Sequence, residues 1–210
     1  MHRCFLFVLL LASPWTVVHA QPDTVGKIIV DRPEGTTGSA AHETRDLWRK
    51  RYRYRLSLAH PDNQRFSPGH IPALVGLLTD GIRQGQLRAV DEHQRPCTWL
   101  DLMLRMARLQ GLPLDTLAYL GPDQLDWTAL AHQIELVADE GIDQNGFRFF
   151  RIQQIRLLWQ ASPGAPPIVL AVIRWEEARS WLEPYAPVPG FSYPYWLETR
   201  QFQATLLPAT

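Results

Sequence analysis

The chain has 210 residues, and its 21 lysine and arginine side chains balance its 21 aspartate and glutamate side chains. This neutral balance argues against a protein that binds polyanions with its whole surface. The length is sufficient for one domain with a substantial hydrophobic core, alone or with an extended arm.

Residues 1–20 have the features of a secretory signal peptide. A short basic start precedes an unbroken apolar run, Phe5–Ala12, and small residues precede Gln21. The apolar run is shorter than the roughly 20 residues of a membrane-spanning helix, and Cys4 precedes the run instead of marking the cleavage point. We therefore expect export, cleavage before Gln21, and neither a lipid anchor nor a transmembrane segment. Cleavage would leave Cys97 without a partner for an internal disulfide.

Residues 21–44 are polar, rich in glycine, threonine, serine and proline, and without periodicity. This composition predicts an extended polar arm, which includes Asp31 and Arg32. Residues 45–210 form the predicted domain.

An alternating segment, Trp48–Leu58, opens the predicted domain. Because successive side chains of a strand point to opposite faces, the alternation predicts a β-strand with one apolar face and one arginine face. The apolar face should belong to the core. Basic residues between aromatics are also typical of nucleic-acid binding, but export and the neutral overall charge argue against that partner. The apolar set is Trp48, Tyr52, Tyr54, Leu56 and Leu58, and the basic set is Arg49, Arg51, Arg53 and Arg55.

Helical spacing follows in the middle of the chain. Apolar residues at helical intervals predict a helix from Ile71 to Gly85. Thr98 and Asp101 resemble a capping box at the start of a second helix, which Gly111 and Pro113 end. A shorter helix is predicted over 121–132.

The second half of the chain is rich in strand-forming residues. We expect a short strand at Ile134–Val137, a turn at 143–146, and an antiparallel pair formed by 147–159 and 168–175. A short helix is predicted over 176–183, whereas 195–207 fits a helix or a strand. The fold class predicted is α+β: a single domain with a mostly antiparallel sheet and helices from the middle of the chain, preceded by the extended arm.

Catalytic and metal-binding signatures are not apparent, and we expect no enzyme activity and no cofactor. The adjacent pairs Asp139–Glu140 and Glu176–Glu177 are interpreted as solvated surface, because neighbouring side chains do not converge on one substrate. Cys97, with His93 nearby, lacks the second ligand cluster of a metal site and is interpreted as a buried cysteine at a helix start. A hydrolase assembled from His60, His70 or His132 is an alternative without a supporting motif.

Several short motifs, in their order along the chain, resemble the gliding-motility family GldN, also called PorN. The first is the tryptophan-basic strand at Trp48, followed by Leu78-Thr-Asp-Gly-Ile82 and Gly85-Gln-Leu87-Arg-Ala-Val-Asp91. The later ones are Ile134–Asp143, Arg151-Ile-Gln-Gln-Ile-Arg156 and Val172-Ile-Arg-Trp-Glu-Glu-Ala-Arg179. The resemblance covers about residues 31–205. The chain departs from the family pattern at Ser57, Ala59 and Val90, which is typical of a divergent member.

The resemblance implies a non-enzymatic structural subunit of the type IX protein secretion and gliding machinery. Members of the family lie in the periplasm and assemble with a GldK/PorK-like outer-membrane lipoprotein into a ring under the outer membrane. The ring connects to inner-membrane motor proteins of the GldL/GldM type. The implied partners are therefore that lipoprotein, further copies of the chain in the ring, and those motor proteins.

Two interpretations of the arginine face remain open at the level of sequence. It could meet acidic surface on the lipoprotein through Trp48, Arg49, Arg51, Arg53 and Arg55, while the arm at 21–44, with Asp31 and Arg32, wraps a neighbouring subunit. It could equally be the solvated outer side of the sheet. A different function, a periplasmic ligand-binding or carrier domain, would use the aromatic loop 185–196 to line a pocket.

Overall fold

The computed structural model describes residues 48–66, 73–112, 133–162 and 164–208. Within these residues the chain forms seven strands, four α-helices and one 3₁₀-helix. Residues Glu43–Thr210 form one compact unit, and these described elements all belong to it. In chain order they are β1 (Trp48–Ser57), η1 (Pro61–Phe66), α1 (Leu74–Arg83), β2 (Ala89–Val90), β3 (Pro96–Cys97), α2 (Trp99–Gln110), β4 (Gln133–Ile142), β5 (Arg148–Trp159), β6 (Ile168–Arg174), α5 (Trp175–Leu182), α6 (Tyr193–Glu198) and β7 (Thr205–Pro208).

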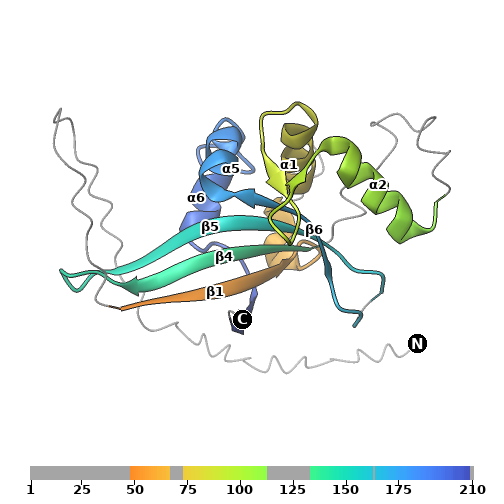
Figure 1. Cartoon of the computed structure of the whole chain (residues 1–210). Coiled ribbons are helices and arrows are strands. Elements are labelled where there is room, and N and C mark those ends of the chain that lie inside the picture. The colour runs from red at the N-terminus through yellow and green to blue at the C-terminus, as the bar shows by residue number, and fades with distance from the viewer. Residues whose placement is uncertain (1–47, 67–72, 113–132, 163, 209–210) are drawn as a thin grey trace, which may run out of the picture. The chain divides into compact units, whose positions relative to one another are not determined.

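The described strands form a single sheet in the order β3-β2-β6-β5-β4-β1-β7, and every neighbouring pair is antiparallel. β4 and β5 are joined by the predicted turn at 143–146, in which Gly146 adopts a positive φ of 82°. The fold is an α+β domain with an antiparallel sheet, as the sequence predicts (Figure 1).

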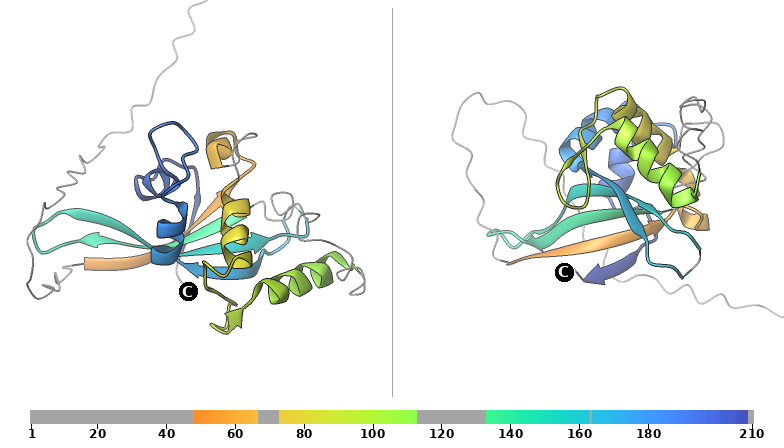
Figure 2. Two further views of the ribbon diagram at one scale, coloured as in Figure 1. Left: turned by 90° about the horizontal axis from the view of Figure 1, so that it is seen from above. Right: turned by 45° about the vertical axis from the view of Figure 1, so that its right-hand side comes forward.

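Helices α1, α5 and α6 gather on one face of this sheet, above the strands in Figure 1, and the second view from above agrees (Figure 2). That face carries the main core. Leu56 of β1, Leu136 of β4 and Ile155 of β5 are fully buried there. Tyr193 of α6 is also fully buried, where its ring stacks on Phe66. The left-hand ends of β1, β4 and β5 extend beyond the helices in Figure 1.

The register between β1 and β4 assigns a face to each side chain of β1. Trp48 pairs with Ile142 and Ser57 pairs with Gln133, without a break between them. Tyr54 and Leu56 therefore share the helix-covered face with Leu136 and Ile134. The predicted core face of β1 is confirmed from Tyr54 onward, whereas Trp48, at the free end of the strand, is 48% exposed.

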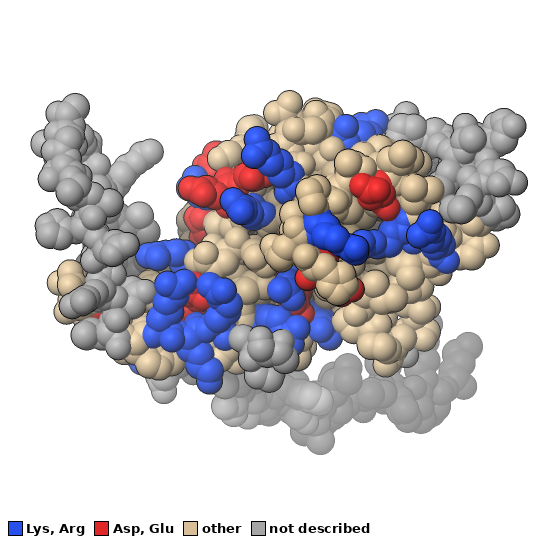
Figure 3. Space-filling view, viewed as in Figure 1, with Lys and Arg blue, Asp and Glu red and all other residues tan. Residues whose placement is uncertain are grey.

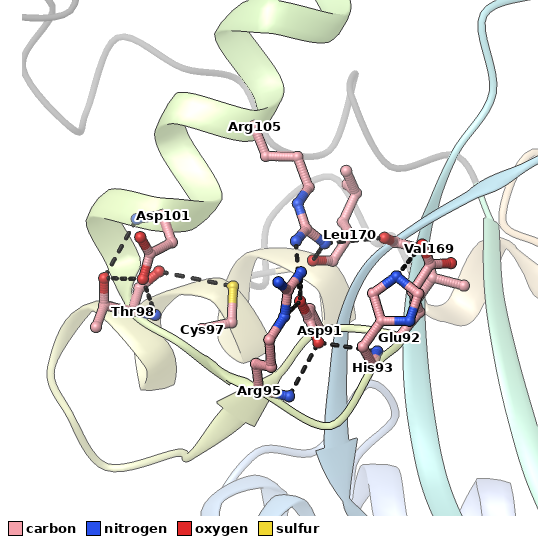
Figure 4. A network of polar contacts seen from close by, with 10 residues as sticks. All are labelled: Asp91, Glu92, His93, Arg95, Cys97, Thr98, Asp101, Arg105, Val169 and Leu170. Atoms are coloured by element: carbon pink, nitrogen blue, oxygen red, sulfur yellow. Dashed lines mark hydrogen bonds and ion pairs between the residues drawn. The ribbon is translucent and has the colours of Figure 1, made fainter.

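One buried carboxylate, that of Asp91, holds the hairpin of β2 and β3 in shape and lies 3.7 Å from the Arg105 guanidinium of α2. Asp91 accepts hydrogen bonds from the backbone N–H groups of His93 and Arg95 at 2.8 and 2.9 Å, and from the Arg95 guanidinium (Figure 4). These hydrogen bonds, the one from the Arg95 N–H above all, lower the pKa of Asp91 to about 2. Burial alone would raise this pKa, but the hydrogen bonds outweigh it. Arg105 of α2 donates to the carbonyls of Val169 and Leu170, beside the same hairpin.

Both predicted start signals of α2 are confirmed. The Thr98 hydroxyl accepts a hydrogen bond from the Asp101 N–H, and the Asp101 carboxylate accepts one from the Thr98 N–H, which completes the capping box. Gly111 ends the helix in the left-handed conformation, with φ of 65°. Cys97 is buried directly before the helix, and burial raises the pKa of its thiol.

The remaining predictions of secondary structure are in part corrected by the structure and in part outside the described residues. The strand predicted at Ile134–Val137 is present, but its predicted length is wrong, because β4 continues through Asp139 and Glu140 to Ile142. Glu135 and Asp139 are tolerated in this central strand because β1 supplies arginines opposite them. Glu140 points to the other face, where it pairs with Arg200 and accepts a hydrogen bond from the Tyr54 hydroxyl. The ambiguous segment 195–207 contains both a helical end, α6, and a strand, β7. The helix predicted over 121–132 and the arm at 21–44 lie outside the described residues.

Among the described helices, none is both long enough and apolar enough to cross a membrane.

Candidate protein-binding face

The arginine face is the side of the sheet opposite α1, α5 and α6. It begins with the four odd-numbered arginines of β1, which the sequence places on one face. In the register of the sheet, the four arginines lie opposite odd-numbered residues of β4, and those residues of β4 lie opposite residues of β5. Two carboxylates, Glu135 and Asp139, lie in the middle of this face, four residues apart on β4. Two further arginines, Arg151 and Arg156, come from β5.

Asp139 forms a tight cluster with the first two arginines. The Arg51 guanidinium donates through Nε to Oδ1 at 2.7 Å and through Nη2 to Oδ2 at 3.1 Å, which is a bidentate fork. Arg49 donates to the same carboxylate through Nη2. The Asp139 side chain is 2% exposed, whereas those of Arg49 and Arg51 are 46% and 52% exposed. We call these three residues the Asp139 cluster.

The protonation of Asp139 reflects opposing effects. Burial by itself would raise the pKa of this carboxyl, but the hydrogen bonds and charges of Arg51 and Arg49 outweigh burial and hold the pKa below its ordinary value. The Arg51 guanidinium shows the reciprocal effect, since its hydrogen bond with Asp139 raises its pKa. Asp139 and Arg51 therefore both carry their charges at neutral pH.

Glu135 is surrounded differently. Its carboxylate, also 2% exposed, is approached by three guanidinium groups, from Arg53 at 3.8 Å, Arg55 at 3.3 Å and Arg156 at 3.3 Å. The three arginine side chains are only 25–28% exposed. These three contacts are longer than the two hydrogen bonds of the fork in the Asp139 cluster. We call these four residues the Glu135 cluster.

Two arginines of the Glu135 cluster each have a hydrogen-bond donor without an acceptor. The Nε atoms of Arg55 and Arg156 are buried and have no hydrogen-bond acceptor among the described residues. A buried donor without an acceptor costs free energy, and native structures contain few of them. The cluster thus holds more donor capacity than its single carboxylate uses.

The rest of the face is basic and partly apolar. Arg151 lies opposite Asp139 in the register, is exposed, and stacks over the ring of Phe149 at 5.3 Å. Val137 lies between the two clusters and is buried even though the described helices α1, α5 and α6 lie on the other face, which is consistent with cover by arginine stems. In Figure 3, basic atoms gather over β1 and β4, with only small acidic patches visible among them.

The structure brings together Arg49, Arg51, Arg53 and Arg55, as predicted, and adds four residues that the sequence did not assign to a site. The interpretation of Asp139 as solvated surface is wrong, since the side chain is buried under two arginines. Glu135, Arg151 and Arg156 were also missed. Glu135 and Asp139 alternate with Val137, which is a signal for a polar face, but only the register shows that this face meets the arginines.

The remaining predicted residues do not join these clusters. Trp48 lies at the far end of β1, and Asp31 and Arg32 lie outside the described residues. His60 is exposed and accepts a hydrogen bond from the Asp62 N–H, while His70 and His132 also fall in segments that are not described. The glutamate pair on α5 fits its surface interpretation in part, because Glu176 is exposed whereas Glu177 accepts from the Arg88 N–H.

Three rings of the aromatic loop 185–196 form a cluster at or near the surface, whereas Tyr193 of the same segment belongs to the core. The ring of Phe191 lies 4.8 Å from that of Tyr195 and 6.0 Å from that of Trp196, and the Arg65 guanidinium lies over the Trp196 ring at 4.3 Å. These rings contact one another. An open hollow of about 490 Å³ lies elsewhere in the described part of the domain, and its lining residues are Gln86, Glu176, Glu177, Ser180 and Trp181.

A comparison with known families gives no matching family model. A comparison with curated proteins also gives no significant match.

Proposed function

We propose that this chain is a non-enzymatic structural subunit that binds an acidic protein surface through its arginine face. By the resemblance of its motifs to the GldN/PorN family, the assembly would be the periplasmic ring of the type IX secretion and gliding machinery, and the partner its GldK/PorK-like lipoprotein.

One observation carries the proposal: among the described residues of β1, β4 and β5, six arginines share one sheet face with two carboxylates, and both carboxylates are buried beneath them. The face therefore presents guanidinium groups and a net positive charge in a chain that is neutral as a whole. Guanidinium groups pair bidentately with carboxylates and are enriched at protein interfaces. Their placement on a rigid antiparallel sheet fixes their spacing before a partner arrives.

The order of the family-like motifs supports the particular assembly. Their residues have structural roles in this chain. Gly81 allows α1 to approach Leu87, because a Cβ atom at that position would lie 2.6 Å from the leucine side chain. Asp91, at the end of the same run, fixes the β2–β3 hairpin. The run that resembles the family is thus a packing unit that brings α1, β2 and β3 together.

The test is co-purification of the mature chain with the GldK/PorK-like lipoprotein of the same organism. The variant is Arg151→Glu, because Arg151 is exposed on the arginine face and its guanidinium lies over the Phe149 ring. The matched control is Arg108→Glu, which reverses the charge of an exposed arginine on α2.

We expect Arg151→Glu to reduce recovery of the lipoprotein at least about tenfold, since like charges placed across an interface cost several kcal/mol. Arg108→Glu should leave recovery unchanged. Equal recovery with both variants, or no binding of the lipoprotein by the unaltered chain, would contradict the proposal.

A further inference from the structure

We propose that the Glu135 cluster is a binding site for one carboxylate, which an aspartate or glutamate of the partner protein supplies. The inference rests on the proposed function, because it specifies which part of the arginine face recognises the partner. It also makes a claim about this chain alone, since the site would exist before the partner binds.

Charge is the first argument. Arg55 and Arg156 both contact the single carboxylate of Glu135 at 3.3 Å, so among these three groups the positive charges outnumber the negative charge. The arginine side chains are about three-quarters buried, so water screens their mutual repulsion less than it would at an exposed site. A second anion at this position would relieve the repulsion and be held more strongly than at the outer surface of the protein.

Hydrogen-bond capacity is the second argument. The Nε atoms of Arg55 and Arg156 are buried donors for which the described residues provide no acceptor. The contacts that Arg55 and Arg156 do make with Glu135 use Nη atoms, at 3.3 Å. An added carboxylate has two oxygens with about four acceptor positions, so it could accept from the guanidinium groups without displacing Glu135.

Access and shape are the third argument. β7 lies at the edge of the sheet and pairs with β1 at Arg53 and Arg55, so these arginines stand one strand from the edge. The helices α1, α5 and α6 cover the opposite face (Figure 1). The planar guanidinium fork matches a planar carboxylate. Glu135 already places one carboxylate among these guanidinium groups, so their arrangement suits a carboxylate.

The experiment observes the arginine Nε–Hε signals of the mature chain by ¹⁵N nuclear magnetic resonance. The probe is the peptide acetyl-Gly-Glu-Gly-amide, which carries one carboxylate, and the matched control is acetyl-Gly-Gln-Gly-amide. We expect the signals of Arg55 and Arg156 to shift saturably with the glutamate peptide and not with the glutamine peptide. The absence of a saturable shift, equal shifts with both peptides, or tighter binding of inorganic phosphate would overturn the inference.

Two variants separate a binding site from a merely structural cluster. Arg156→Gln removes one donor group and one charge, and should weaken binding of the glutamate peptide at least about tenfold. Glu135→Gln removes the competing charge and should tighten binding severalfold, with a larger rise of Tm on adding the peptide than the unaltered chain shows. A cluster that only stabilises the fold would give no tightening in Glu135→Gln.

The control variant Arg108→Gln should bind the peptide as the unaltered chain does. Circular dichroism of each variant checks that it is folded, and if Glu135→Gln does not fold, Arg156→Gln still decides. The titration uses no partner protein. A failed titration would therefore overturn the carboxylate site, while co-purification with Arg151→Glu still tests the assembly. Failure of the co-purification would contradict the assembly, while the titration still tests the carboxylate site.

Discussion

The Asp139 cluster and the Glu135 cluster use arginines of the same strand against carboxylates of the same neighbouring strand, yet they differ in how completely the charges are satisfied. Asp139 receives a bidentate fork from Arg51 and a further bond from Arg49, and both guanidinium groups are about half exposed. Glu135 is shared among three arginines that are mostly buried and makes longer contacts with them.

The contrast teaches that an arginine-rich strand face is not uniform in what it can do. Where each buried carboxylate is matched by well-aligned donors, the cluster is a structural joint between β1 and β4. Where β5 adds a third arginine, donors and charge exceed what the carboxylate can satisfy. We therefore assign a mainly structural role to the Asp139 cluster and partner recognition to the Glu135 cluster.

The largest expected effect is that of Glu135→Ala on stability. Removing this carboxylate takes away the acidic partner that Arg55 and Arg156, both mostly buried, contact at 3.3 Å, so we expect a loss of about 3–5 kcal/mol in the free energy of unfolding. Urea unfolding measures it. Glu176→Ala, an exposed glutamate on α5, is the control and should change stability by less than about 0.5 kcal/mol. A loss below about 1 kcal/mol for Glu135→Ala would show that the cluster is well hydrated.

Asp139→Ala should cost less, about 2–3 kcal/mol, although Asp139 makes the better hydrogen bonds. The reason is that Arg49 and Arg51 are about half exposed and can be rehydrated once the carboxylate is gone. Unfolding under the conditions used for Glu135→Ala gives the comparison. If Asp139→Ala proved the more damaging of the two variants, the difference in burial would not be what separates the clusters.

Gly141→Ala should disturb the Asp139 end of the sheet selectively. A Cβ atom on Gly141 would lie 2.2 Å from the Trp48 carbonyl oxygen and 2.6 Å from the Phe149 ring, so β1 must move away from β4 there. We expect a loss of about 1–3 kcal/mol. Gly76→Ala, in α1, has nothing within 4 Å of the added Cβ and should stabilise the helix by about 0.5–1 kcal/mol. A Gly141→Ala variant as stable as the unaltered chain would contradict the close approach.

Acid unfolding should show a smaller effect of the Asp139 cluster. A carboxyl with a lowered folded pKa stabilises the fold above its unfolded pKa, near 3.8, and this contribution is lost as the pH falls through the folded value. Asp91, with a pKa lowered to about 2, contributes in the same direction. Stability should therefore decline from about pH 4 downward, and less steeply in Asp139→Asn and Asp91→Asn. An unchanged slope in Asp139→Asn would contradict ion pairing there.

Much of the fold follows from local signals in the sequence. The alternation in Trp48–Leu58 predicts β1 and its two faces, Thr98 and Asp101 predict the start of α2, and the turn at 143–146 predicts the β4–β5 hairpin. These signals are local because hydrogen bonds and side-chain directions repeat over a few residues. The length of β4 was not predicted, since Asp139 and Glu140 resemble an exposed break until their neighbours on β1 are known.

Only the part of the candidate site that lies on β1 was predicted from the sequence. The arginines of β1 are recognisable by their spacing, but the carboxylates between them and the third arginine, Arg156, come from strands about 80 and 100 residues later in the chain. Such pairings depend on register, and a slip of one residue would turn Glu135 and Asp139 to the helix-covered face. Burial of a carboxylate under arginines has no local sequence signal.

The most direct test of the assigned roles compares two arginines of the same face. The affinity of the mature chain for the GldK/PorK-like lipoprotein is measured by titration calorimetry for Arg156→Gln, in the Glu135 cluster, and for Arg51→Gln, in the Asp139 cluster. The account predicts a loss of at least about tenfold for Arg156→Gln and less than about threefold for Arg51→Gln. Equal losses, or a larger loss for Arg51→Gln, would contradict it.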